Sequence, residues 1–325
     1  MKKGIRYARL SAAIVAAVYG ASMAHGQTVL TWDPTQTSPP QDGSGSWDTV
    51  TPEWYNSSTT LTQAWNNSDT PPDTAVFGND TSSDASTSGT QNTVILTTPL
   101  SVQDLILGTA TPGPTPGYYS FIDYGDSNEQ LTLNGNLIKA SAVGESTFEL
   151  SAPINLTAGN HVVAINDTPG AVPELSMEEF NDNSLTGPGS ITMNNAYNSS
   201  GYTPYGTLVL DTDNTYTGGT NIQDGSVTAN ASNALGTGTV TIGSLGNLEF
   251  GGNGTIQPNS LTITNPIIIT RNTYTGTGYS DYPDAITSSN SGAANNGPVT
   301  LTFNSTPPMI WIPPVSPVLL PLRVT

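Results

Sequence analysis

Carboxylates are the only side chains numerous enough here to suggest chemistry. The 325 residues include 25 Asp and Glu, two His and no Cys. Two carboxylates can serve as acid and base in glycoside cleavage when they lie about 5–10 Å apart. Glu178, Glu179 and Asp182 come nearest to such a group, but adjacent side chains on a strand point to opposite faces. We therefore expect no catalytic residue among them.

The segment from Asp211 to Asn214 (DTDN) begins like a calcium-binding loop. An EF-hand loop needs Gly at its sixth position and Glu at its twelfth, where this chain has Tyr216 and Ile222. A turn that hydrogen-bonds its own backbone accounts better for the segment. Two His without Cys cannot build a Cys/His metal cluster. We expect neither a metal nor an organic cofactor.

Nucleophilic catalysis has equally little support. His25 lies at the end of the amino-terminal segment, and His161 lies in a strand-like AGNHVVAI run, where we expect it to face solvent. No GxSxG, HExxH, Walker or GxGxxG motif occurs in a suitable context. The sequence therefore predicts that the protein is not an enzyme.

The first 24 residues read as a secretory signal peptide. Four basic residues precede a short apolar run from 10 to 19, and Ser22-Met23-Ala24 places small residues where a signal peptidase cuts. The run is too short to span a bilayer comfortably, so we expect cleavage after Ala24 and no membrane span in the mature chain. The predicted location is secreted or on the cell surface.

Removing this segment makes the chain strongly acidic. Only Lys139, Arg271 and Arg323 remain against the 25 acids, so the formal net charge changes from −18 to −22. Such a surface repels phosphate backbones and anionic lipids, and we expect no nucleic-acid partner. The absence of cysteine means that an exported fold must rely on packing and backbone ladders.

The composition predicts an all-β chain. It contains 33 glycines, abundant Asn, Thr and Ser, and apolar residues that alternate with polar ones in short runs. We expect residues 131–138 (LTLNGNLI) to turn a corner, with Gly135 at positive φ, and Pro173 to Asp182 to loop out. Strands are predicted at 102–107, 130–133, 137–140, 147–150, 154–156, 161–165, 190–193, 208–210, 227–229, 240–242, 248–250, 261–263, 267–269 and 299–303.

The most ordered pattern lies between residues 206 and 242. Its core is NTYTGGT, which comprises Asn214, Thr215, Tyr216, Thr217, Gly218, Gly219 and Thr220. Ile222 and Gly225 follow, and the pattern closes with ALGTGTV from 234 to 240; a second, incomplete copy reads NTYTG at 272–276. These features resemble the autotransporter-associated β-strand repeat, also called the passenger-associated transport repeat.

The resemblance implies a right-handed parallel β-helix, or solenoid, in an exported passenger protein. It also implies structural importance for the seven motif residues, and an outer-membrane translocator, missing from this chain, as a partner. The residues alone support many short strands with Gly/Asn turns, which a β-sandwich could also satisfy.

Four of the five tryptophans cluster before residue 66, at Trp32, Trp47, Trp54 and Trp65. One interpretation is a Trp-rich cap over residues 25–99 that seals the open first coil of a solenoid. The other is glycan binding, with Trp47 and Trp54 as candidate contacts, because indole faces stack well on sugar rings. Both interpretations remain open at this point.

Residues 100–305 form the predicted repeat region, and residues 306–325 differ from it. This tail has six prolines in twenty residues and no Asn, Gly or Asp. Proline removes ladder donors and disfavours a helix. An interrupted reading frame, a Pro-rich linker and a non-standard anchor are the three interpretations that we consider.

Together these patterns predict a non-catalytic, structural or adhesive surface protein with an unknown surface or glycan ligand. The alternatives are a carbohydrate-active β-helix enzyme or glycan-binding module, and a truncated fragment of a longer autotransporter passenger.

Overall fold

The computed structural model describes residues 27–38, 40–78, 91–107, 118–123, 129–140, 147–166, 174–177, 185–194, 206–250, 261–270, 286–288 and 299–301. These residues form strands, turns and bends, so the fold is all-β as predicted. The described part of the chain includes no helix with the length and apolarity that a membrane crossing requires.

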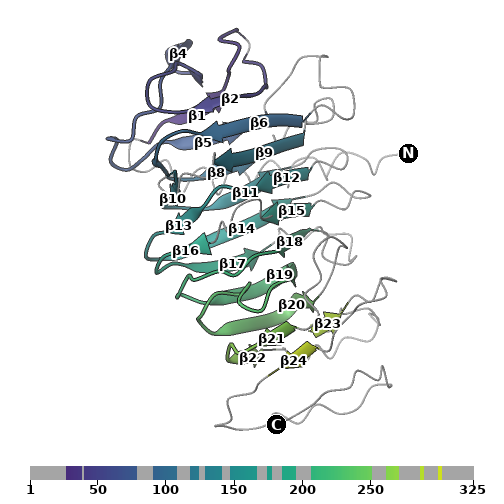
Figure 1. Ribbon diagram of the computed structural model, residues 1–325. Coiled ribbons are helices and arrows are strands. Elements are labelled where there is room, and N and C mark those ends of the chain that lie inside the picture. The colour runs from purple at the N-terminus through teal and green to yellow at the C-terminus, as the bar shows by residue number, and fades with distance from the viewer. Residues whose placement is uncertain are drawn as a thin grey trace, which may run out of the picture.

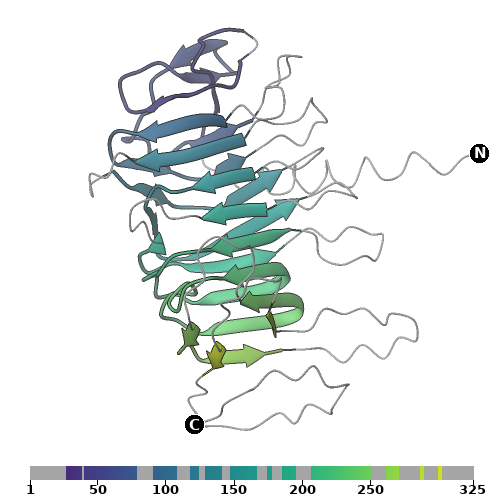
Figure 2. The same ribbon diagram turned by 45° about the vertical axis from the view of Figure 1, so that its right-hand side comes forward.

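Most strands belong to three series of parallel pairs, which we call the first, second and third ladders. In each ladder, the neighbours come from successive passes of the chain, as in a stack of rungs (Figures 1 and 2). Parallel pairing of this kind satisfies the backbone donors and acceptors of each strand with those of the strands on either side.

The first ladder runs through nine strands. They are β1 (Val29–Trp32), β5 (Thr74–Phe77), β8 (Leu105–Leu107), β11 (Leu137–Ala140), β14 (Asn160–Asn166), β17 (Ser190–Asn194), the start of β19 (Thr220–Ala229), the start of β20 (Val240–Phe250) and β22 (Ile267–Ile269).

The second ladder is similar in length and shares two strands with the first. Its members are β2 (Gly45–Trp47), β6 (Gln91–Leu96), β9 (Tyr118–Asp123), β12 (Thr147–Leu150), β15 (Glu174–Met177), β18 (Thr207–Leu210), the ends of β19 and β20, and β23 (Ile286–Ser288).

The third ladder contains the short strands β7 (Leu100–Val102), β10 (Leu131–Leu133), β13 (Ile154–Leu156) and β16 (Leu185–Thr186). A separate parallel pair joins β21 (Leu261–Ile263) to β24 (Val299–Leu301). Antiparallel pairing occurs only at the amino-terminal end of the described chain, where β3 (Trp54–Asn56) lies between β1 and β4 (Leu61–Gln63).

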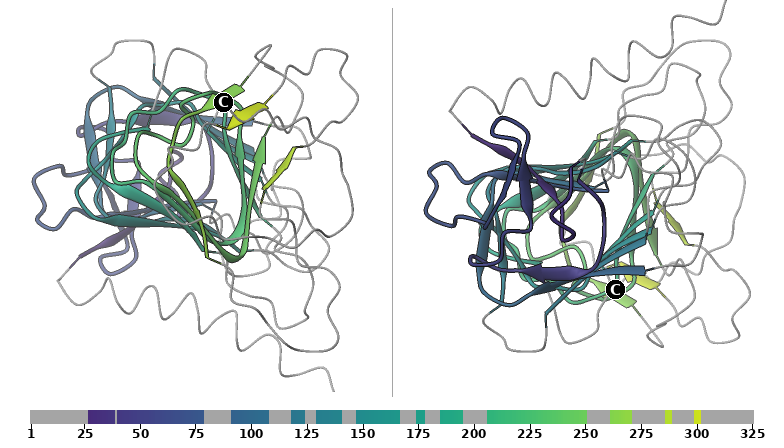
Figure 3. Two further views of the ribbon diagram at one scale, coloured as in Figure 1. Left: turned by 90° about the horizontal axis from the view of Figure 1, so that it is seen from below. Right: turned by 90° about the horizontal axis from the view of Figure 1, so that it is seen from above.

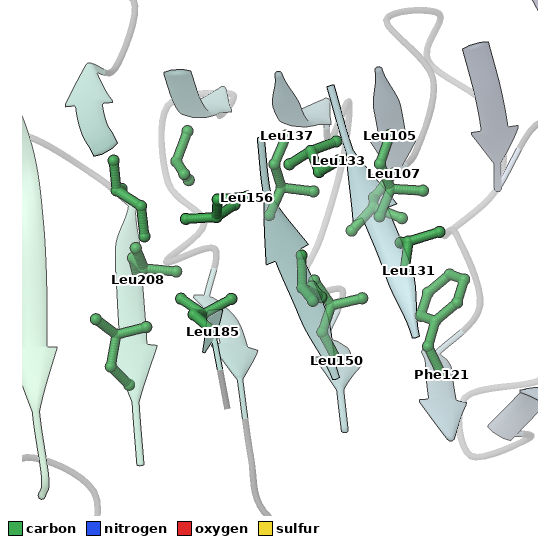
Figure 4. Close-up of a cluster of buried hydrophobic side chains, with 14 of the residues drawn as sticks. Leu105, Leu107, Phe121, Leu131, Leu133, Leu137, Leu150, Leu156, Leu185 and Leu208 are labelled. Carbon is green, nitrogen blue, oxygen red and sulfur yellow. The ribbon is translucent and has the colours of Figure 1, made fainter. Parts of the chain in front are cut away.

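Strand alternation builds the interior. In β10, Leu131 and Leu133 are buried while Thr132 is half-buried. Leu131 pairs with Leu100 and with Ile154, so apolar side chains line up in columns from rung to rung. Figure 4 shows buried apolar side chains, Leu131 among them, that come from several strands, and Figure 3 shows the strands arranged around a common interior when viewed along the stack. Each fully buried Leu or Ile contributes about 2 kcal/mol of apolar burial.

The corner between the third and first ladders is tightly built. The predicted strand at 102–107 is divided there into β7 and β8, and LTLNGNLI turns at the same place between β10 and β11. Gly135 does not have the positive φ that we expected, since its φ is not among the left-handed ones. A Cβ at Gly135 would instead lie 2.2 Å from Asp104 Oδ1 and 2.7 Å from the Gln103 carbonyl oxygen, so close approach between rungs requires the glycine.

One predicted loop is wrong. Residues Glu174–Met177, inside the acidic segment expected to loop out, form β15 and pair in parallel with β12 and β18. The local ELSM sequence is compatible with a strand, and the neighbouring rungs supply the hydrogen-bond partners that decide its conformation.

Candidate functional site

The amino-terminal end of the interior is filled by aromatic side chains. Trp32, Trp47, Trp54 and Trp65 are at most 1 % exposed, and Phe77 packs against three of them. Ring centroids in this cluster are 4.7–5.4 Å apart, in tilted or edge-on arrangements.

This burial bears on the glycan contact considered for Trp47 and Trp54. Both indoles are 0 % exposed, so neither offers a face on which a sugar ring could stack. The packing has the form expected of a segment that closes the end of the apolar interior. The indole N–H groups of both residues have no hydrogen-bond partner in the structure, whereas those of Trp32 and Trp65 donate to the Gly43 and Ser101 carbonyl oxygens at 2.9 and 3.1 Å.

Among the carboxyl groups beside this cluster, Glu53 has the pKa that is shifted furthest from its ordinary value. It is 9 % exposed, and its Oε2 has no hydrogen-bond partner. A Cβ placed at Gly45 would lie 2.8 Å from Glu53 Oε1 and 2.8 Å from Trp32, which shows how closely these groups pack. Burial, with a smaller contribution from Asp48, raises the pKa of Glu53 to about 7. The group can therefore carry a proton near neutral pH.

Asp33 adjoins Glu53 through the backbone, since the Asp33 amide donates to the Glu53 carbonyl oxygen at 2.8 Å. Its buried Oδ1 orders the following turn by accepting hydrogen bonds from Thr35 Oγ1 and from the amides of Thr37 and Gln41. Glu53 packs beside apolar rings and Asp33 orders a turn, so these surroundings favour a structural role for both carboxyl groups.

Two other buried carboxyl groups also titrate above their ordinary range. Burial raises the pKa of Asp73, which accepts a hydrogen bond from the Thr28 amide, to about 6. Burial raises the pKa of Asp224, where β19 passes from the first to the second ladder, to about 6 as well. Sequence reasoning missed Glu53, Asp73 and Asp224, because single acids in polar surroundings carry no local signal of burial.

The NTYTGGT motif occupies the corner that precedes β19. Asn214 is 2 % exposed and connects three passes of the chain: its Oδ1 accepts from the Leu185 amide at 2.7 Å, and its Nδ2 donates to the Ala234 carbonyl oxygen at 2.6 Å. Tyr216 and Thr220 are buried beside it, while Thr215 and Thr217 are exposed. Side chains that bond three passes at once hold the ladders in register.

The motif glycines are needed for close approach. A Cβ at Gly218 would lie 2.5 Å from the Gly189 backbone of the preceding pass. Gly219 has φ of +92°, and a Cβ there would lie 2.5 Å from the Thr239 carbonyl oxygen. Other side chains are therefore excluded from both positions.

Asp211 and Asp213 bond to the next pass, whereas we expected a turn that bonds to its own backbone, and they do not face a common centre. Asn230 Nδ2 donates to Asp211 Oδ1, and the Asn233 amide donates to Asp213 Oδ1 at 3.0 Å. Across the described ranges, no group of three or more His, Asp or Glu side chains is placed to hold a metal ion.

His161 differs from the sequence expectation. It is 1 % exposed, in an inward position of β14, and does not face solvent. Its Nδ1 lies 2.5 Å from the Gly135 carbonyl oxygen and its Nε2 lies 2.8 Å from that of Thr157. The ring thus links its own pass to the preceding one.

Several residues discussed above fall outside the described residues. These are Glu178, Glu179 and Asp182, the signal segment with His25, the second NTYTG copy and the tail from 306 to 325.

Within the described chain, several buried polar side chains, such as Asn214 and His161, are bonded to the backbone of neighbouring passes. Scans against protein-family models, curated proteins and solved structures found no match to this chain.

Proposed function

We propose that this protein is an exported, non-catalytic surface protein whose strands form a right-handed parallel β-solenoid with a structural or adhesive role. The main support is the continuity of the first ladder from β1 to β22, in which each pass of the chain adds one parallel strand. The handedness and the passenger-type role rest on the resemblance of residues 214–220 to the autotransporter-associated repeat.

The contacts that the motif residues make favour a structural role for them. Asn214, Tyr216, Gly218 and Gly219 all contact neighbouring passes. In such a stack, an individual coil has no independent core, and stability is shared along the axis. The long side surfaces of the stack then remain for contact with a partner.

Small-angle X-ray scattering on the mature chain tests the solenoid. We expect a distance distribution with the long tail of an elongated particle. A symmetric distribution for a compact particle of this mass would contradict the proposal and favour a sandwich.

Export has its own test. Expression of the full chain with a carboxy-terminal tag, followed by fractionation and amino-terminal sequencing, should give an extracytoplasmic product that begins at His25. An unprocessed cytoplasmic chain that begins at Met1 would contradict export. A polysaccharide panel assayed for released reducing ends should give no product; release by the purified protein would support the carbohydrate-active enzyme instead.

A further inference from the structure

We propose that the outward surface of the third ladder binds a neutral, hydroxyl-rich polysaccharide. This inference rests on the proposed function, and it specifies the class of ligand. We call this surface the neutral face and define it by six residues: Ser101, Thr132, Asn155, Thr186, Thr215 and Thr217.

The face is a regular array. Thr132 pairs in register with Ser101 on one side and with Asn155 on the other, and Asn155 pairs with Thr186. All four are half-buried, and Ser101, Thr132 and Asn155 each lie between two buried apolar residues. Successive rungs in a parallel ladder are about 4.8 Å apart. Three strands of this face, β10, β13 and β16, lie one above another along the left side of Figure 1.

The NTYTGGT motif extends the array by a further rung. The amides of Thr215 and Thr217 donate to the Leu185 and Gly187 carbonyl oxygens at 2.8 and 3.0 Å, so both exposed threonines continue the third ladder beyond β16. Thr237 follows in the next pass, because its amide donates to the Tyr216 carbonyl oxygen at 3.0 Å.

Hydrogen bonds orient several hydroxyl groups on this side of the molecule. Thr157 Oγ1, Thr186 Oγ1 and Thr237 Oγ1 each lie within 3.2–3.5 Å of a carbonyl oxygen of the preceding pass and donate to it. A hydroxyl that has donated its proton retains two lone pairs that can accept. In Thr186, one of the two already accepts from Gln130 Nε2 at 3.3 Å, which leaves one for a ligand. Such a surface suits a partner rich in O–H donors, and a chain of sugar hydroxyls provides them at regular intervals.

The charge pattern selects against ionic partners. None of the six defining residues is charged, although the chain carries 25 acids. Asp213 borders the face, and its Oδ1 already accepts the Asn233 amide. The acidic remainder of the molecule repels anionic polymers. A neutral polymer is not repelled, and it has no charged groups that would lose their hydration on binding. Many weak hydrogen bonds along an extended polymer add up through multivalency.

Retention of the mature chain on insoluble cellulose and chitin tests the proposal, with soluble polygalacturonate as the anionic probe. We expect retention on at least one of the neutral polymers that added salt does not abolish. The double variant Thr132→Glu/Asn155→Glu places two charges on adjacent rungs of the face, and we expect its retention to fall by about tenfold or more.

The matched control is Asn221→Glu/Thr241→Glu. This pair also replaces one Asn and one Thr on adjacent rungs, but on the outward side of the first ladder, where both residues are half-buried. We expect control retention within about twofold of the unmodified chain. Thermal unfolding of both variants verifies that each folds.

Three results would overturn the inference: no retention on either neutral polymer, equal loss in the two double variants, or preferential binding of polygalacturonate. Selective binding to a protein-coated resin that is lost in the face variant would assign the surface to a protein partner and also overturn it. An elongated scattering profile alongside any of these results would leave the proposed solenoid intact. A compact profile would contradict the solenoid itself.

Discussion

The Tyr216 hydroxyl oxygen lies 2.5 Å from Thr220 Oγ1 in the buried interior, and both residues belong to the NTYTGGT motif. Thr220 Oγ1 donates onward to the Leu235 carbonyl oxygen at 3.2 Å, so Tyr216 must be the donor in the shorter bond. Burial raises the pKa of Tyr216 above its ordinary value, so its phenol is protonated at neutral pH. The chain Tyr216–Thr220–Leu235 thus joins the motif to the following pass.

Replacement of Tyr216 by Phe tests this connection. Removing the hydroxyl should lower the free energy of unfolding by about 1 kcal/mol, because the buried Thr220 loses one partner but retains its bond to Leu235. Tyr216→Ala should cost about 3–5 kcal/mol, since a cavity is added. A double-mutant cycle with Thr220→Val, followed by urea denaturation, measures the coupling. A coupling energy of zero would contradict the bond.

Gly218→Ala tests close approach between passes. The added Cβ would lie 2.5 Å from backbone atoms of Gly189, which cannot move without breaking the ladder. We expect a loss of about 2–4 kcal/mol in the free energy of unfolding. The matched control is Gly43→Ala, whose Cβ would lie 3.0 Å from a Pro34 ring carbon, and we expect a smaller loss. Equal losses for the two variants would show that the approach to the Gly189 backbone does not set the effect, because the entropy change of a glycine-to-alanine replacement alone would stabilise both variants.

Glu53 should make stability depend on pH. Its pKa is raised from 4.5 to about 7 in the folded state, so the folded chain binds more protons than the unfolded chain between these values. The contribution to stability is complete below about pH 4.5 and is lost as pH rises through 7. Glu53→Gln should remove this pH dependence. Because the amide carries no buried charge above pH 7, the variant should be more stable than the unmodified chain at pH 8 by on the order of 1–2 kcal/mol.

Thermal unfolding of the Glu53 variant and the unmodified chain across pH 4–8 is the corresponding measurement. Asp73 and Asp224 contribute a similar dependence at lower pH, with folded-state pKa values of about 6, so the difference between the two curves isolates Glu53. Parallel curves would show that Glu53 titrates normally.

Trp47→Ala and Trp54→Ala should each destabilise the amino-terminal segment by about 3–5 kcal/mol, because each removes a fully buried indole from the aromatic cluster. Near-ultraviolet circular dichroism should lose the signal of the packed rings, and protease cleavage should begin within residues 27–78. Exposed Val50→Ala is the control and should have little effect. A variant that loses glycan binding while the segment remains folded would favour the stacking interpretation instead.

Several strand positions could be predicted from the sequence. Predicted strands at 137–140, 147–150 and 154–156 coincide with β11, β12 and β13, since alternating apolar residues bounded by Gly, Asn and Pro carry the strand period locally. The segment 174–177 was missed, because its alternation covers only four residues within an acidic stretch and its strand partners are distant in sequence.

The sequence by itself determined that this chain is all-β, acidic, cysteine-free and divided into short strands by glycine- and asparagine-rich corners, because these properties follow from composition and from a period of two residues. Only the tertiary structure decided which side chains are buried. His161 and Glu53 lie inside, Trp47 and Trp54 lose their exposed faces, and Asn214 bonds three passes, because burial and hydrogen bonding depend on contacts between residues about 20 to 30 positions apart. Strand pairing establishes those contacts, and local sequence does not encode them.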